Sequence, residues 1–190
     1  SDTAVAVFLG DRSEDYKALD GDPDLNVKTF QQTLRGMLEA ARAHPNKQFA
    51  LIVRPHPRAT DENLLSFVGE LPSNLAVVQD GEISFDEALY AADIICCAIT
   101  STESFLARYR GREAGIFMYP GKGLEGDMAH KIYDEDSLKV LGSTDGISLL
   151  SSEHDLANRI SDIDPTRPRK SPDHAKDSTE KIRSILLGKE

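Results

Sequence analysis

Short, nearly continuous apolar runs alternate with amphipathic segments along most of the chain. The runs have the composition of buried strands and lie at 4–10, 49–55, 75–78, 93–98, 115–120 and 146–150. Apolar residues at the three- and four-residue spacing of helices fill the segments 27–42, 62–71, 84–92, 103–110 and 151–160. Strands without polar alternation are typical of a parallel sheet covered by helices on both faces. The pattern predicts an α/β fold: a Rossmann-like, doubly wound parallel sheet of about six strands.

The chain is predicted to form one domain followed by a short extension. Residues 1–163 carry the alternating pattern, and "DPTRPRKSP" at 164–172 has the proline content of a connector. Residues 173–190 hold an amphipathic helix, which we expect to pack back on the domain. At the first long helix, Asn26 precedes the periodic residues and is the predicted N-cap.

Charge and composition exclude several classes of partner. The 190 residues are 39% hydrophobic and carry a formal net charge of -10, which argues against a nucleic-acid partner because such binding needs basic surface. No apolar run has the roughly 18 residues of a membrane span, and the start "SDTAVAVFLG" lacks signal-peptide features, so we expect a cytoplasmic protein. The adjacent Cys96 and Cys97 are interpreted as buried thiols, and no metal site is predicted.

In open parallel sheets, ligands bind beyond the carboxyl ends of the strands, where the strand order reverses. Gly10 and Arg12 follow the first predicted strand and begin a connection of about 16 residues, longer than most strand-to-helix loops. Such a loop is either a binding loop or a plain surface loop. Gly10 and Arg12 are therefore candidate substrate-binding residues.

The segment "RPHPR" follows the second predicted strand. Pro55 and Pro57 restrict the backbone around His56 to extended conformations, so the imidazole is held in a fixed turn. Arg54 and Arg58 add guanidinium groups that can donate to a phosphate. We predict His56 as the catalytic residue, with Arg54, His56 and Arg58 in the binding site, against the alternative of a purely structural histidine.

Three hydroxyl residues in a row follow the fourth predicted strand, namely Thr100, Ser101 and Thr102. Thr100 and Glu103 fit a capping box, which would make the segment a helix start and nothing more. The free amides of a helix start also form an anion site, and three hydroxyls exceed the needs of one cap. We predict that the three residues contact a phosphate.

A glycine-rich stretch, "GKGLEG", follows the fifth predicted strand. It formally matches G-x-G-x-x-G, but a dinucleotide fingerprint belongs at the first strand-to-helix turn of its unit, so a nicotinamide or flavin site is not predicted. Lys122 within the stretch is a candidate positive charge near a ligand. No cofactor is predicted.

The order of these motifs resembles a known family. "RPHP" after one strand and "ITST" two units later, within "AADIICCAITST" and "GIFMYP", are similar to the C-terminal half of GT-B glycosyltransferases. The similarity is closest to the branch of CDP-glycerol glycerophosphotransferases and bacterial sialyl- and polysialyltransferases, with their HP and ST motifs. It covers residues 4–160, and its specificity lies in the order of short motifs.

The resemblance implies a domain that binds a nucleotide-linked sugar or polyol donor for cell-surface glycan or polymer synthesis. His56 would contact the donor phosphate or nucleotide, and Ser101 and Thr102 would bind the phosphate. GT-B enzymes are metal-independent and react between two Rossmann-like domains. This chain would then be the donor half, and we expect little turnover without the N-terminal domain.

Two alternatives remain open. A GT-B relative such as a nonhydrolysing UDP-N-acetylglucosamine 2-epimerase would need carboxylates at the cleft, for which Asp80, Glu82 and Asp127 are the candidates. A noncatalytic binding or assembly module would explain Glu103 near the hydroxyls, and Leu106 at a position where the family often has a glutamate. The sequence leaves the donor base, the acceptor and the oligomeric state open.

Overall fold

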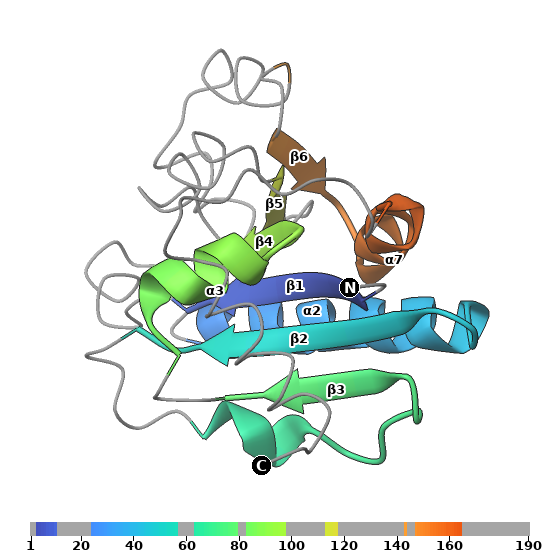
Figure 1. Cartoon of the computed structure of the whole chain (residues 1–190). Helices are drawn as coiled ribbons and strands as arrows, with labels where there is room; N and C mark the ends of the chain where they lie inside the picture. Colours follow the sequence, from blue (N-terminus) through green and yellow to red (C-terminus); the bar gives the residue numbers. More distant parts are fainter. Residues whose placement is uncertain are drawn as a thin grey trace.

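The structure is a computed structural model that describes residues 3–10, 24–56, 63–79, 83–97, 113–117, 143 and 147–164 (Figure 1). Up to residue 97 the chain alternates between strands and helical segments, as the sequence predicts, and the predicted helix at 103–110 lies outside the described residues. In chain order, the elements are β1 (Thr3–Leu9), α2 (Leu25–Ala43), β2 (Gln48–Arg54), the 3-10 helix η1 (Leu64–Phe67), β3 (Leu75–Val78), α3 (Phe85–Ala91), β4 (Ile94–Cys97), β5 (Glu113–Phe117), β6 (Ile147–Leu150) and α7 (Glu153–Asp162).

The strands form one sheet in the order β3-β2-β1-β4-β5-β6, and each pairing between them is parallel. β1 lies at the centre, with Leu9 opposite Arg54 of β2 and Ala6 opposite Ile94 of β4. The chain moves outward from β1 to β2 and β3, then returns to β4 on the other side of β1. This order confirms the predicted Rossmann-like sheet, and its reversal lies between β1 and β4.

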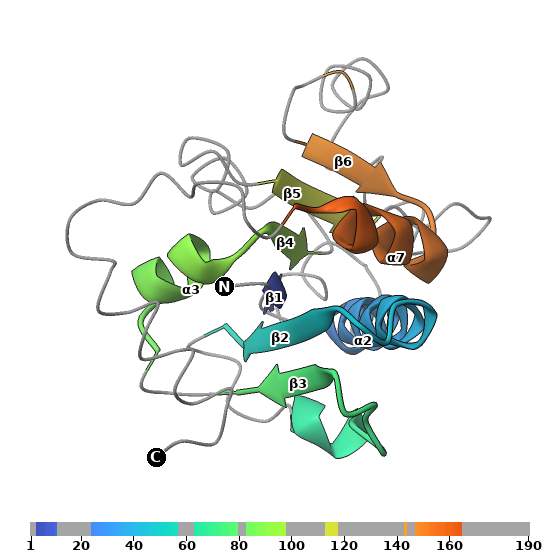
Figure 2. The same cartoon turned by 45° about the vertical axis from the view of Figure 1, so that its right-hand side comes forward.

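Helices cover both faces of the sheet, as expected for a doubly wound fold. Figure 2 shows α2 and α7 on one side and α3 on the other. Along β1, Ala4, Ala6 and Phe8 pack in the cluster with α2 and α7, while the intervening residues pack with α3. Phe8 and Phe30 of α2 meet edge to face, with ring centroids 5.4 Å apart. The central strand is apolar throughout because successive side chains face two different helical layers.

Two helices begin with a capping box formed by serine and an acidic residue. In α3, the Ser84 hydroxyl accepts from the Glu87 amide at 3.2 Å, and the Glu87 carboxylate accepts from the Ser84 amide at 2.7 Å. In α7, Ser152 and Asp155 form the same reciprocal pair. The predicted segment 151–160 is therefore helical, but its first two residues lie outside the helix as cap and pre-cap residues.

The predicted helix at 62–71 is wrong. The described part of this segment contains only η1, and Val68 already has extended dihedral angles. Of its apolar residues Leu64 is fully buried, whereas Leu65 and Phe67 are among the exposed large hydrophobic residues. Leu64, Val68 and Leu71 still pack against the core, but from a segment that is extended after Phe67, and Pro72 disfavours helical geometry at the preceding residue.

Two boundaries also differ from prediction. Helix α2 begins at Leu25, so Asn26 is not the N-cap; Asp24 occupies that position without a side-chain cap bond, and Asn26 is buried within the first turn. Strand β5 begins at Glu113, two residues before the predicted start at 115, because it pairs in register with β4 from Ile94 onward. The connector at 164–172, apart from Asp164, and the C-terminal helix at 173–190 lie outside the described residues.

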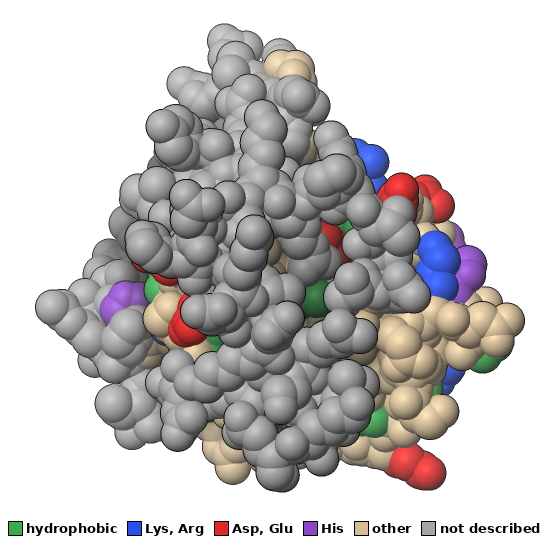
Figure 3. Space-filling model, in the orientation of Figure 1, with side chains coloured by type: hydrophobic (Ala, Val, Ile, Leu, Met, Phe, Trp, Pro, Cys, Tyr) green, Lys and Arg blue, Asp and Glu red, His purple; other side chains and the backbone are tan. Residues whose placement is uncertain are grey.

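Helices α2 and α7 are joined at the surface by an ion pair. Figure 3 shows basic, acidic and histidine side chains together over α7. His154 Nδ1 lies 2.5 Å from Glu39 Oε1, and both side chains are exposed. The hydrogen bond to Glu39, followed by its charge, raises the pKa of His154 above the ordinary value.

This pair makes the docking of α7 weakly dependent on pH. Because the folded-state pKa of His154 is raised, its contribution is complete below the unfolded-state pKa and is lost as the pH rises through the folded-state value. We expect His154→Gln to lower the melting temperature slightly between about pH 5 and 6, and to have no effect at about pH 9. Thermal unfolding across this range tests it; a difference that is constant with pH would contradict the ion pair.

Candidate functional site

The carboxyl ends of β1 and β2 are joined directly. Gly10, the residue after β1, donates its backbone N–H to the Arg54 carbonyl at 2.9 Å. The two predicted segments, "GDR" and "RPHP", thus start from the same edge of the sheet and from neighbouring strands. In Figure 1 the arrowheads of β2 and β3 point toward the side on which α3 begins, which is this edge.

Gly10 occupies a position that leaves little room for a side chain. A Cβ there would lie 3.2 Å from Pro55 Cα and 3.3 Å from both amide atoms of the Asn26 side chain. These separations are tighter than ordinary van der Waals contact. A side chain at position 10 would therefore push Pro55 and the Asn26 side chain away from the end of β1. The close approach of β1, Pro55 and α2 explains the glycine without any requirement for special dihedral angles.

Asn26 is a component of this edge that the sequence analysis misplaced. Its side chain is 1% exposed and lies against Gly10 at the start of α2. The sequence signal for this position is an asparagine near the start of a predicted helix, because asparagine disfavours helix interiors and needs a reason to stand there.

His56 directly follows Pro55 and is partly exposed at the same edge. The backbone bond between Gly10 and Arg54 fixes the start of its turn two residues earlier. Gly10, Arg54 and His56 are the three predicted site residues that the structure places at the ends of these two paired strands. His56 therefore lies two residues beyond the last residue of β2, the strand next to the central β1.

The Arg54 side chain is directed to the opposite face of the sheet from Asn26. Arg54 Nη1 donates to the backbone carbonyl of Ile83, in the connection between β3 and α3. Burial lowers the pKa of the guanidinium, and the nearby Glu87 carboxylate partly opposes this effect. One donor of the predicted phosphate-binding arginine is thus occupied by a backbone carbonyl.

The other predicted site residues lie outside the described residues. They are Arg12, Arg58, Thr100, Ser101, Thr102 and Lys122, and the carboxylates proposed for an epimerase, Asp80, Glu82 and Asp127, lie there too. In the sequence, Thr100 comes three positions after Cys97, the last residue of β4. The described chain before this segment thus ends with β4, the strand next to β1.

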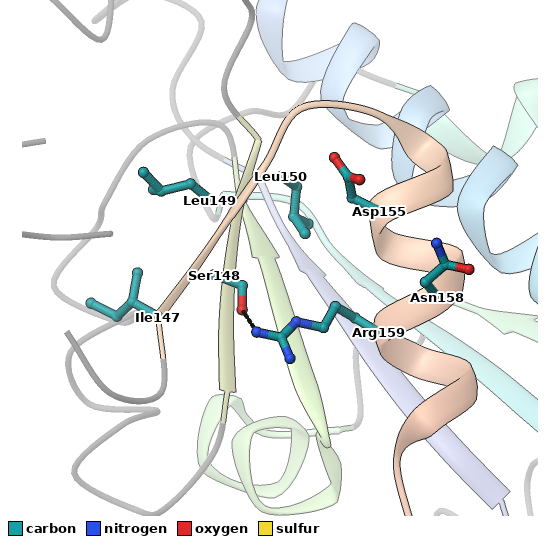
Figure 4. Close-up of a pocket in the computed structure, with 7 residues that line it drawn as sticks. All are labelled: Ile147, Ser148, Leu149, Leu150, Asp155, Asn158 and Arg159. Carbon is teal, nitrogen blue, oxygen red and sulfur yellow. Dashed lines mark hydrogen bonds between the residues drawn. The ribbon is translucent and has the colours of Figure 1, made fainter. Parts of the chain in front are cut away.

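A second concave feature lies at the other end of the sheet, between β6 and α7 (Figure 4). This cavity of about 450 Å³ is lined by residues of both elements. Arg159 Nη2 donates to Ser148 Oγ at 2.8 Å across it, and the Asp155 carboxylate accepts from the amides and hydroxyl of the helix cap. Its charged groups thus already serve the attachment of α7 to β6.

Two general features of the described part of the chain bear on function. No helix in it is long and apolar enough to cross a membrane. Among these same residues, His, Cys, Asp and Glu nowhere gather in a group of three that could hold a metal ion. Cys96 and Cys97 form no disulfide with each other and are buried in β4.

Comparisons with known proteins leave the family open. No family profile matches the sequence, and no curated protein is significantly similar to it. A structure of MAR1 ribonuclease from Caenorhabditis elegans is similar over 90% of this chain and 98% of its own length, with 12% identity and a TM-score of 0.33. A likeness this distant carries no argument about activity.

Proposed function

We propose that this chain is the donor-nucleotide-binding half of a GT-B glycosyltransferase or glycerophosphotransferase. The observation that carries the proposal is the position of His56, beyond β2 and tied through Arg54 to Gly10 at the end of the central strand. Ligands of doubly wound sheets bind at this edge, where the strand order reverses. The order of the RPHP and ITST motifs along the chain gives the glycosyltransferase class.

The phosphate of the donor is the group that this edge would recognise. In the proposed arrangement His56 donates to a phosphate oxygen, and the segment Thr100–Thr102 supplies hydroxyls and helix-start amides. Arg12, Arg58 and Lys122 are the basic residues of the adjoining segments. In a protein with a net charge of -10, an anionic ligand depends on such locally placed donors.

With a glycerophosphate donor the acceptor hydroxyl would attack phosphorus, the phosphoanhydride bond would break and the nucleoside monophosphate would leave. With a sugar donor the proposed reaction is displacement at the activated carbon of the donor. The acceptor hydroxyl forms a bond to that carbon, the bond from carbon to the phosphate oxygen breaks, and the nucleotide leaves with the electron pair. His56 and the helix-start amides stabilise the charge that develops on the departing phosphate. The acceptor proton passes to a base of an N-terminal GT-B domain, which is also the source of the acceptor site, so the domain alone binds donor without turnover.

A pair of variants tests the hydroxyl segment. We expect Ser101→Ala combined with Thr102→Ala to weaken nucleotide binding about tenfold or more, because a charge-assisted hydrogen bond contributes about 1.5–3 kcal/mol. Calorimetric titration and urea unfolding are measured on the same samples. Ser152→Ala is the matched control, since it removes the cap of α7 and costs stability away from the site.

The outcomes of this test are distinct. Loss of stability with unchanged affinity would mean that the hydroxyls only cap a helix. Affinity and stability that both remain within error would exclude the segment from the site. Either result would leave the noncatalytic assembly module as the better interpretation of the fold.

A further inference from the structure

We infer that Arg54 is a positioning residue that ties the His56 turn to the start of α3, and that it does not itself contact the donor phosphate. The inference rests on the proposed function for its ligand but on the described contacts for its geometry. It replaces the expectation that Arg54 is one of the phosphate donors.

Arg54 joins three segments of the carboxyl edge. Its backbone carbonyl accepts from Gly10 at the end of β1, and its side chain donates to the carbonyl of Ile83. Ile83 is 3% exposed and packs in the cluster that holds α3 against the sheet. The residue before Pro55 and His56 is therefore held through its backbone to the neighbouring strand and through its side chain to the face covered by α3.

A carboxylate and a backbone carbonyl of the protein itself partly balance the positive charge of Arg54. Glu87 lies near enough for its carboxylate to influence the guanidinium, and one Glu87 oxygen accepts from the Ser84 amide in the capping box. The same Glu87 carboxylate thus caps the start of α3 and acts electrostatically on the Arg54 guanidinium. A guanidinium with a backbone carbonyl and a carboxylate as neighbours has less to gain from a phosphate than an arginine without such neighbours.

The direction of the Arg54 side chain also supports a positioning role. Ala50, Ile52 and Arg54 alternate with residues facing α2, and Ala50 and Ile52 belong to the cluster with α3. Arg54 continues this row, away from Asn26 and from the Gly10 approach. Its role is to fix the backbone from which the next residues project, so that His56 presents its ring in one orientation.

Hydrogen exchange on the ligand-free full chain tests whether Arg54 holds the end of β1 and the start of α3 in place. We expect Arg54→Met to accelerate exchange of the Gly10, Glu87 and Ala88 amides about tenfold, because these donors lie in the segments that Arg54 holds. The Phe49 amide, bonded to Asn74 at the far edge, should be unchanged. Arg42→Met in the exposed last turn of α2 is the control for loss of a positive charge. The His56 ring signal should move in Arg54→Met and stay in Arg42→Met.

Titration with CDP and UDP at several salt concentrations separates positioning from contact. A positioning role predicts about tenfold weaker binding in Arg54→Met with the same dependence on salt as the wild type. A smaller salt dependence would show that Arg54 contacts the phosphate and would overturn the inference, as would exchange rates and a His56 signal equal to those of Arg42→Met. If the wild type binds neither nucleotide, CDP and UDP are excluded as ligands of this chain. The exchange experiment still tests whether Arg54 holds the end of β1 and the start of α3.

Discussion

Replacing Asn74 with alanine is expected to lower the free energy of unfolding by about 3 kcal/mol. The Asn74 side-chain nitrogen lies 2.9 Å from the Ala41 carbonyl, 3.1 Å from that of His44 and 2.9 Å from that of Lys47. These carbonyls belong to the end of α2 and the turn into β2, where a helix leaves acceptors without intrahelical partners. Asn74 is 6% exposed, so water does not replace the lost donor freely.

Urea unfolding of Asn74→Ala and Asn74→Asp measures this effect. Aspartate keeps the shape but removes the donor and turns a carboxylate toward carbonyl oxygens, so we expect it to cost at least as much as alanine. Asn158→Ala is the control, because Asn158 is exposed on α7 and such substitutions stay within about 0.5 kcal/mol. A loss of less than about 1 kcal/mol in Asn74→Ala would mean that the three contacts do not hold the turn.

Replacing Gly36 with leucine is expected to cost about 3 kcal/mol, through separation of α7 from α2. A Cβ at Gly36 would lie 2.8 Å from the Glu153 carbonyl oxygen and 3.0 Å from Leu156 Cδ2. The first contact is with backbone at the start of α7, which cannot rotate away. A glycine in the middle of α2 costs helix stability, and the close contact between the helices explains its presence.

A graded series identifies the cause. Gly36→Ala gains about 1 kcal/mol of helix propensity but meets the same backbone oxygen, so we expect a net loss smaller than that of leucine. Gly69→Ala is the matched control, since nothing lies within 4 Å of its Cβ and we expect no loss there. Thermal and urea unfolding serve for both; a Gly36→Ala protein more stable than the wild type would show that α7 does not pack this closely.

The fold was predictable because the strands are short and apolar on both faces. In β1 and β2 the side chains pack alternately against α3 and against the layer of α2 and α7, so the polar residues of these strands, Thr3, Gln48 and Arg54, stand at their ends. The capping boxes of α3 and α7 were not predicted, although serine and an acidic residue stand at the required spacing in both segments. Periodicity failed at 62–71, because the apolar residues there pack against the core from a segment that is extended after Phe67.

The candidate site was predictable only in part. The sequence places Gly10 and His56 after two predicted strands, and in the structure these strands, β1 and β2, are parallel neighbours, with Arg54 as the last residue of β2. The binding roles of these residues stay predictions. The sequence could not show that the Arg54 side chain turns to Ile83, or that Asn26 lies against Gly10, because both contacts depend on how the helices pack. The roles of Thr100, Ser101 and Thr102 stay predictions.

The central claim is that this edge binds a nucleotide-linked donor through His56. Calorimetric titration of the purified chain with CMP, CDP, UMP, UDP, GDP and ADP, beside a His56→Ala variant, tests it most directly. We predict that one base is preferred and that His56→Ala weakens its binding about tenfold while the unfolding transition is unchanged. Binding that is equal in the two proteins, or absent for every nucleotide with a chain carrying both GT-B halves, would contradict the claim.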